Sequence, residues 1–282
     1  MSTPTVSELF DMTGRTAVVT GGAGFLGRQH ARALAEAGCR VALWDIDATS
    51  LDAAKEELTR DFPEQIDGYD VDITDKTSVD ASRERLAQQF GGLNVLVNNA
   101  GITVARGKEK FKNYFAAFES YPIELWEMAL AVNLTGSFVV TQSLSTLLKQ
   151  RPGKASIINI ASDVGVISPD HRIYRANPER GYRGADFNTP LSYAASKAAL
   201  IHMTKYWATY WAGDGIRVNA VSPAGVENQQ DSAFKRELVE RIPLGRMARP
   251  HELKGAIVFL ASDASSFVTG SNLIVDGGRT VW

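Results

Sequence analysis

The chain has 282 residues, of which 44% are hydrophobic and 22% are charged, and its formal net charge is -2 at pH 7. This length and apolar content predict a protein with a sizeable core and exclude a chain that is disordered throughout. The slightly acidic balance argues against a nucleic-acid or anionic-membrane surface, so we expect a small-molecule substrate as the partner. The histidines are scattered along the sequence, and no metal site is expected.

The N-terminal residues 1–13 are interpreted as an extension ahead of a single domain, residues 14–282. The extension lacks the basic start and apolar block of a signal peptide, and no uninterrupted apolar run reaches about 18 residues. We therefore expect a cytoplasmic protein without a membrane segment. The single cysteine, Cys39, excludes an intrachain disulfide, and its place at the start of an apolar run predicts a buried thiol.

A glycine-rich turn follows the first predicted strand, residues 15–20. The turn reads Gly21-Gly-Ala-Gly24-Phe-Leu-Gly27, and a helical pattern then runs to about Gly38. Glycines let the backbone approach a phosphate closely, and the helix N-terminus offers unpaired N–H groups to a pyrophosphate. A glycine cluster alone is often only a tight turn. The order of strand, turn and helix here predicts a dinucleotide site that includes Gly21, Gly24, Phe25, Leu26 and Gly27.

The second predicted strand, residues 40–44, leads into Asp45. This is the distance from the glycines at which a carboxylate would meet the ribose of an adenosine. The carboxylate would accept hydrogen bonds from the ribose hydroxyls but repel a 2′-phosphate, and Ile46 supplies no compensating cation. We therefore predict NAD as the cofactor rather than NADP. The nearest basic residues, Arg28 and Arg40, are interpreted as an exposed helix residue and a strand-start residue.

Alternating helix and strand patterns continue to residue 97. Helical patterns cover residues 48–60 and 75–90, and strand patterns cover residues 66–71 and 94–97. Repeated strand and helix units predict an α/β fold, a Rossmann-type doubly wound parallel sheet with helices on both faces. Ligands of such sheets bind at the carboxyl ends of the strands, which adds to the predicted cofactor site Asp72, Ile73, Asn99, Ala100 and Gly101.

The sequence Tyr193-Ala-Ala-Ser-Lys197 places a phenol and an ammonium group four residues apart. In a helix the two side chains lie on one face, where the cation would favour the phenolate and lower the pKa of the phenol. Tyr193 could then exchange a proton with an alcohol or a carbonyl group. The same spacing arises by chance on many helices, so the pair is informative only beside a cofactor site.

Together with later motifs, these features resemble the single-domain branch of the short-chain dehydrogenase/reductase family. The resemblance runs from about Gly14 to the C-terminus and implies a sheet of about seven strands. Its parts occur in the family's order: the glycine turn after Thr20, Asn98-Asn-Ala-Gly101, Asn133, Ser162, Tyr193 with Lys197, Asn219-Ala-Val-Ser-Pro223 and Val275-Asp-Gly-Gly278.

The resemblance implies roles for these residues. Tyr193 would be the general acid and base, and Lys197 would lower its pKa and bind the nicotinamide ribose. Ser162 would hydrogen-bond to the reacting oxygen, and Asn133 would hold a water molecule that links Lys197 to solvent. Association into a homodimer or homotetramer is also implied. Further cofactor contacts are implied at Pro223, Val226 and Asn228.

The chain departs from the family pattern at four places. Phe25 stands where the single-domain branch usually has the middle glycine of the turn, and this spacing also resembles the longer, epimerase-like branch. Ala224 and Asn228 replace a preferred glycine and threonine. Two insertions, residues 102–121 and residues 166–190, are expected to lie over the active site or, for the first, at a subunit contact.

The second insertion suggests a substrate, because it carries His171, Arg175 and Arg183. Arginine binds carboxylates and phosphates through paired hydrogen bonds, so we expect a sugar, sugar acid or sugar phosphate. A solvated loop whose charges pair among themselves is the alternative for the insertion. The alternatives for the function are a 3-hydroxyacyl or cyclic-alcohol dehydrogenase and, in another class, a catalytically silent NAD-binding sensor.

Aromatic residues follow the Tyr193 motif at helical spacing. Tyr206 and Tyr210 form one i, i+4 pair, and Trp207 and Trp211 form another. This is too much apolar surface to leave in water, so we expect packing in the core or against another subunit.

Overall fold

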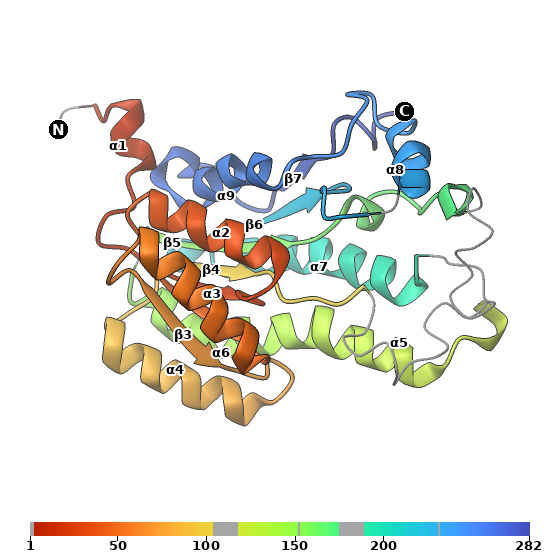
Figure 1. Ribbon diagram of the computed structural model, residues 1–282. Coiled ribbons are helices and arrows are strands. Elements are labelled where there is room, and N and C mark those ends of the chain that lie inside the picture. Colours follow the sequence, from red (N-terminus) through yellow and green to blue (C-terminus); the bar gives the residue numbers. More distant parts are fainter. Residues whose placement is uncertain (1–2, 104–117, 152, 175–188, 231) are drawn as a thin grey trace.

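A computed structural model describes residues 3–103, 118–151, 153–174, 189–230 and 232–282 (Figure 1). Its centre is a 7-stranded parallel sheet with the order β3-β2-β1-β4-β5-β6-β7, so the direction of winding changes between β1 and β4. The predicted doubly wound Rossmann-type sheet is confirmed. The strands are β1 (Thr16–Thr20), β2 (Arg40–Asp45), β3 (Ile66–Asp70), β4 (Val95–Asn98), β5 (Ala155–Ile160), β6 (Ile216–Pro223) and β7 (Asn272–Val275).

Helices cover both faces of the sheet, with α2, α3 and α9 on one face and α4, α6 and α7 on the other (Figure 1). The described helices are α1 (Val6–Phe10), α2 (Phe25–Glu36), α3 (Ala48–Asp61), α4 (Lys76–Phe90), α5 (Ile123–Leu130), α6 (Ser137–Lys149), α7 (Leu191–Tyr210), α8 (Ser232–Val239) and α9 (Lys254–Ala261).

Two apolar cores lie between the sheet and these helix layers. Leu34 and Ile257 pack on one face of the sheet, and Leu144 and Trp207 pack on the other. Every residue of β1 is buried, because a parallel sheet covered on both faces has no solvent-facing side. This rigid centre fixes where the carboxyl ends of the strands lie.

Aspartates begin two of the helices. Asp47 accepts a hydrogen bond from the Ser50 backbone N–H at 3.1 Å at the start of α3. Asp75 does the same for Thr77 at 2.9 Å, so α4 begins at Lys76 rather than at the predicted residue 75. The carboxyl end of the preceding strand is thereby joined to its helix by a short turn.

The N-terminal extension is anchored to the domain. Thr5 and Glu8 form a capping box at α1, a helix without buried residues. Met12, by contrast, is fully buried in the core beside α2. Cys39 is fully buried as predicted, and burial raises the pKa of its thiol to about 12.

A π-helical turn, Ala131–Gly136, lies between α5 and α6. The stretch Ile123–Lys149 is long and apolar enough to cross a membrane, but core helices of soluble proteins also meet that criterion. Such π turns often mark functional sites, because they turn one side chain out of the helical register. Here that turn contains Asn133.

The aromatic pairs on α7 have different environments. Trp207 and Trp211 are each 6% exposed and pack in the core. Tyr206 and Tyr210 are 62% and 65% exposed and stack on each other with ring centroids 6.0 Å apart. Core packing therefore accounts for only the tryptophan pair.

A small third core joins α8 to the short helix η4 (His171–Tyr174), which lies in the second insertion. Ile173, Leu238, Ile242 and Met247 are buried together, and the Tyr174 ring stacks on Phe234 at 5.7 Å. Figure 1 shows the C-terminus beside α8. The described part of the insertion thus packs on α8.

Candidate active site

The glycine turn between β1 and α2 brings backbone atoms unusually close together. A Cβ atom on Gly27 would lie 2.1 Å from the Gly21 carbonyl oxygen, and one on Gly21 would lie 2.8 Å from the Ala100 Cα. Gly24 is the N-cap of α2 and provides no side-chain cap, so the first N–H groups of the helix face the turn. This arrangement is suited to an anionic group.

The turn forms one side of a cavity of about 390 Å³ at the carboxyl ends of the strands. The cavity runs between α2, the ends of β4, β5 and β6, and α7. Most of the predicted site residues line it: Gly21, Gly24, Phe25, Leu26, Gly27, Asn99, Ala100, Gly101, Ser162, Tyr193, Lys197, Pro223, Val226 and Asn228. The fold therefore brings most of the predicted cofactor residues and three predicted catalytic residues together.

A second cavity of about 250 Å³ adjoins the first and shares Gly21, Ala100 and Gly101 with it. Asp45, Asp72 and Ile73, the other predicted cofactor residues, line this cavity. The Asp45 carboxylate is 5% exposed and accepts hydrogen bonds from the backbone N–H groups of Ala23 at 3.0 Å and Asp47 at 3.2 Å. The two cavities together form an extended site around the point where the strand order changes direction.

Tyr193 and Ser162 contact each other across the first cavity. Tyr193 lies in the first turn of α7, and Ser162 follows β5. Burial raises the pKa of the Tyr193 phenol, and its hydrogen bonds with Ser162 and Thr103 partly oppose that effect. The phenol is therefore protonated at neutral pH in the protein alone.

Lys197 lies one turn after Tyr193 and is 4% exposed. Its Nζ atom donates a hydrogen bond to the Ile160 carbonyl at 2.7 Å and lies 5.7 Å from the centroid of the Tyr193 ring. Burial lowers the pKa of the ammonium group to about 8. The predicted lowering of the Tyr193 pKa by Lys197 stays a prediction, because burial dominates both groups here.

Asn133 is fully buried in the π turn and lies behind the cavity. Its Oδ1 accepts a hydrogen bond from the Ile102 N–H at 2.7 Å, and its Nδ2 donates to the Ile102 carbonyl at 3.0 Å and to Ser196 Oγ at 3.1 Å. A Cβ on Gly101 would lie 3.3 Å from Asn133 Oδ1 and 3.4 Å from Lys197 Nζ. Asn133 and Lys197 thus flank the same glycine.

The predicted substrate residues are not part of these cavities as far as the structure describes them. His171 is exposed in η4 and lines neither cavity. Arg175 and Arg183 lie outside the described residues. Beside His171, Arg172 is paired with Asp170 at 2.8 Å, in agreement with the alternative of a loop whose charges pair with one another.

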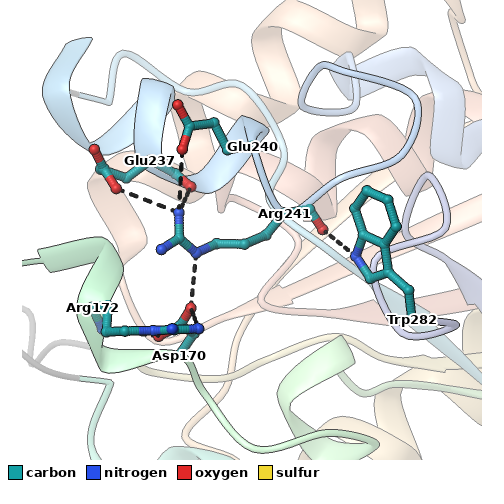
Figure 2. A network of polar contacts seen from close by, with 6 residues as sticks. All are labelled: Asp170, Arg172, Glu237, Glu240, Arg241 and Trp282. Carbon is teal, nitrogen blue, oxygen red and sulfur yellow. Dashed lines mark hydrogen bonds and ion pairs between the residues drawn. The ribbon is translucent and has the colours of Figure 1, made fainter.

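Asp170 also connects the insertion to the end of α8 (Figure 2). Arg241 Nε donates to Asp170 Oδ2 at 2.8 Å, and the Arg241 carbonyl accepts a hydrogen bond from the Trp282 indole at 3.3 Å. The two arginines hold the pKa of the Asp170 carboxyl well below its usual range. Segments from three parts of the chain are thereby joined.

Sequence reasoning missed several residues at this site. Thr103 and Gln230 line the first cavity. Gln230 donates to the Val226 carbonyl at 2.6 Å and accepts from the Asn228 N–H at 2.7 Å. Their positions beside Gly101 and Asn228 are the only signals that could have identified them, because threonine and glutamine are ordinary loop residues.

Two sequence models of known families cover most of the chain. The model described as short chain dehydrogenase matches residues 15–176, and the one described as enoyl-(acyl carrier protein) reductase matches residues 181–280. The chain belongs to the short-chain dehydrogenase family. As a member of this family, it is an oxidoreductase that acts on alcohol or ketone groups.

Similar proteins span nearly the full length of this short-chain dehydrogenase. The 3-oxoacyl-[acyl-carrier-protein] reductase FabG of Thermotoga maritima is 36% identical over 279 residues, covering 96% of this chain and 99% of that protein. D-threitol dehydrogenase of Mycolicibacterium smegmatis is 33% identical over 277 residues, covering 96% and 95%. A crystal structure of gluconate 5-dehydrogenase from Burkholderia cenocepacia J2315 with NADP and tartrate has a TM-score of 0.83 at 31% identity, covering 99% of this chain and 100% of that one.

Proposed function

We propose that this short-chain dehydrogenase uses NAD to interconvert a secondary alcohol and a ketone on a sugar, sugar acid or sugar phosphate. The observation that carries the proposal is that Tyr193, Ser162 and Lys197 line one cavity with the glycine turn. A proton-transfer group and a dinucleotide cradle thus share one site. This is the arrangement that alcohol oxidation with a nicotinamide requires.

The residues present fit a dinucleotide. The close contact of Gly27 with the Gly21 carbonyl leaves no room for a Cβ, so the turn keeps its backbone N–H groups accessible to a pyrophosphate. Asp45 would bind the adenosine ribose, and Lys197 would bind the nicotinamide ribose. When bound, the nicotinamide accepts or donates the hydride.

The protein's own contribution is the movement and stabilisation of a proton. In the oxidation direction, the Tyr193 phenolate would take the proton of the substrate hydroxyl, and in reduction the phenol would return it. Lys197 in its charged form favours the phenolate electrostatically. Ser162 would hydrogen-bond to the reacting oxygen, and Asn133 would connect Lys197 to solvent through a water molecule.

The choice of NAD rests on the surroundings of Asp45. Its carboxylate would repel a 2′-phosphate, and the next residue, Ile46, is 59% exposed and uncharged. Arg28 is paired with Glu57 at 2.9 Å.

Because the structure of the similar gluconate 5-dehydrogenase contains NADP, the choice of NAD needs a direct test. We expect NADH to bind at least about tenfold more tightly than NADPH, and Asp45→Ala to narrow that ratio, in fluorescence titrations. Equal affinities for the wild-type protein would overturn the assignment.

A polyhydroxylated substrate is supported by the polar lining of the cavity. Thr103, Ser162 and Gln230 line it, which suits hydroxyl groups better than an alkyl chain. The D-threitol and gluconate dehydrogenases among the relatives act on such compounds by name. The similarity to a 3-oxoacyl reductase favours the alternative of an acyl substrate.

The test is NADH formation with a panel of sugars, sugar acids, sugar phosphates, hydroxyacyl thioesters and cyclic alcohols, with Tyr193→Phe as the control. Turnover of polyhydroxylated compounds that is lost in the control is the expected result. Turnover of hydroxyacyl thioesters or cyclic alcohols alone would show that the substrate is not a sugar, sugar acid or sugar phosphate. NAD binding without turnover of any compound would favour the NAD-binding sensor.

We also propose a homodimer or homotetramer. Tyr206 and Tyr210 form a stacked, exposed pair on α7, and Ile123 is 59% exposed on α5, which contacts α7. Phe138 on α6 is 43% exposed. Exposed apolar surface of this extent is typical of a subunit contact. Light scattering on the eluted protein tests the assembly, and Tyr210→Glu is expected to shift it toward the monomer. A monomeric wild-type protein would contradict the proposal.

A further inference from the structure

A buried ion pair lies directly behind Ser162. Asp163, the next residue, begins the short helix η3 (Asp163–Gly165), and Arg279 comes from the C-terminal segment. Their side chains are 5% and 8% exposed, and Arg279 Nη1 is bonded to Asp163 Oδ2. The other carboxylate oxygen, Oδ1, accepts hydrogen bonds from Ser162 Oγ at 2.9 Å and from the Val164 N–H at 2.8 Å. The carboxylate therefore joins Ser162 to the C-terminal segment.

The turn after β7 is built so that Arg279 points inward. Asp276 accepts hydrogen bonds from the backbone N–H groups of Gly278 at 2.8 Å and Thr280 at 2.7 Å. Gly277 and Gly278 have φ values of +65° and +93°, and Cβ atoms there would lie 2.7 Å from Ile242 and 2.8 Å from Pro243. Only glycine fits both requirements. The closing Val275-Asp-Gly-Gly278 motif thus delivers the arginine side chain to Asp163.

The charge of Asp163 acts on Tyr193, the proposed acid–base group. Burial raises the pKa of Asp163, and the charge of Arg279 and the hydrogen bonds to the carboxylate only partly oppose that effect. The Asp163 charge in turn raises the pKa of Tyr193. Among the described residues, the other titratable groups facing Tyr193 are Lys197 on the same helix and Tyr174 on η4.

We propose that Asp163 and Arg279 are positioning residues for Ser162 and Tyr193. Before substrate binds, the carboxylate accepts the single Ser162 proton and fixes the serine side chain in the position from which its hydroxyl turns to the reacting oxygen. The arginine cancels the carboxylate charge beside the phenol. This inference rests on the proposed dehydrogenase function. It adds two residues that act through the catalytic groups. Neither of them lines the described cavities.

Three variants test the charge role and the orienting role separately. At the alkaline pH where Tyr193 ionises, Arg279→Met leaves an uncompensated carboxylate beside it. The double variant Asp163→Asn with Arg279→Met removes both charges but keeps an amide oxygen that can accept the Ser162 hydrogen bond. Asp163→Ala with Arg279→Met also removes both charges but leaves Ser162 without that acceptor. Arg60→Met is the matched control, because Arg60 pairs with Glu56 on the exposed face of α3.

The first measurement is an absorbance titration of Tyr193. In each background the signal of the Tyr193→Phe protein is subtracted, so that only the ionisation of Tyr193 remains. We expect Arg279→Met to raise the midpoint by about 1 pH unit and both double variants to bring it back to the wild-type value or below. An unchanged midpoint in folded Arg279→Met overturns the charge role. If Arg279→Met does not fold, the two double variants decide the charge role. It is overturned if the Tyr193 ionisation midpoint in both of them lies above the wild-type value.

The second measurement is kcat and KM for NADH formation at a pH where Tyr193 ionises equally in the two double variants. We expect the alanine double variant to have a kcat about tenfold lower than the asparagine double variant at similar KM, because Ser162 has lost its orientation. Equal kcat values overturn the orienting role. If wild-type protein turns over none of the panel, the dehydrogenase proposal fails, whereas the Tyr193 titration still tests the pair independently.

Discussion

Replacing Lys197 with methionine is predicted to stabilise the protein at pH 7 while abolishing turnover. The ammonium group is buried, its hydrogen bond goes to the neutral Ile160 carbonyl, and its pKa falls from 10.5 to about 8. The difference between those values, about 2.5, corresponds to about 3 kcal/mol at about 1.4 kcal/mol per pH unit. Loss of the hydrogen bond to Ile160 offsets about 1 kcal/mol, so the net gain is about 2 kcal/mol.

The pH dependence of this gain follows from the sign of the pKa change. Below about pH 8 Lys197 is protonated in both states, and the full cost of burying the charge is present. Between about pH 8 and 10.5 the unfolded chain holds a proton that the folded protein has released, so wild-type stability rises with pH. Above about pH 10.5 the methionine variant is expected to have lost its advantage.

The assay is urea unfolding followed by tryptophan fluorescence at pH 7, 9 and 10.5, at one protein concentration. Lys205→Met, on the exposed side of the same helix, is the control and is expected to change stability by less than about 0.5 kcal/mol at each pH. A Lys197→Met protein that is less stable than wild type at pH 7 would refute the reasoning. A Lys197→Met protein whose gain in free energy of unfolding is the same at all three pH values would also refute it.

Three further predictions concern binding and packing. Gly27→Ala is expected to abolish NADH binding in a fluorescence titration, because the new Cβ would lie 2.1 Å from a carbonyl oxygen of the glycine turn; retained affinity would contradict the geometry. Leu58→Ala should cost about 2–5 kcal/mol in urea unfolding, since Leu58 is fully buried, whereas Arg60→Ala on the exposed face should cost less than about 0.5 kcal/mol. Arg241→Gln is expected to accelerate hydrogen exchange in α8. The loss of stability should be only about 1 kcal/mol, because the ion pair with Asp170 is partly exposed. Unchanged exchange would show that the apolar contacts alone hold α8 in place.

The fold could be predicted because its signals are local. Alternating strand and helix patterns and the glycine turn depend on residues within about 20 positions of each other, which is the range that periodicity reports. Asp45 illustrates this: it ends a strand, and a parallel sheet places every strand end at the same edge. Asp72 and Asn99 reach the site for the same reason.

The parts that could not be predicted depend on tertiary contacts. The bond between Asp163 and Arg279 joins residues 116 positions apart, and neither residue belongs to a local motif with chemical meaning. The π turn around Asn133 lies between α5 and α6, and periodicity does not distinguish it from a continuous helix. On α7, spacing predicted two aromatic pairs, but only the orientation of the helix on the sheet decides that Trp207 is buried and Tyr206 exposed.

Burial at the active site changes the pKa values of Tyr193 and Lys197 in opposite directions. It raises the pKa of Tyr193 and lowers that of Lys197, so both changes favour the uncharged forms. A phenolate beside an ammonium ion is nevertheless the state that could take a proton from an alcohol at neutral pH. The surrounding charges therefore matter for function: a carboxylate such as Asp163 would make the phenolate less favourable unless a cation compensates it. Arg279 supplies that compensation from the far end of the chain, so the closing turn of the sequence and the catalytic helix depend on each other.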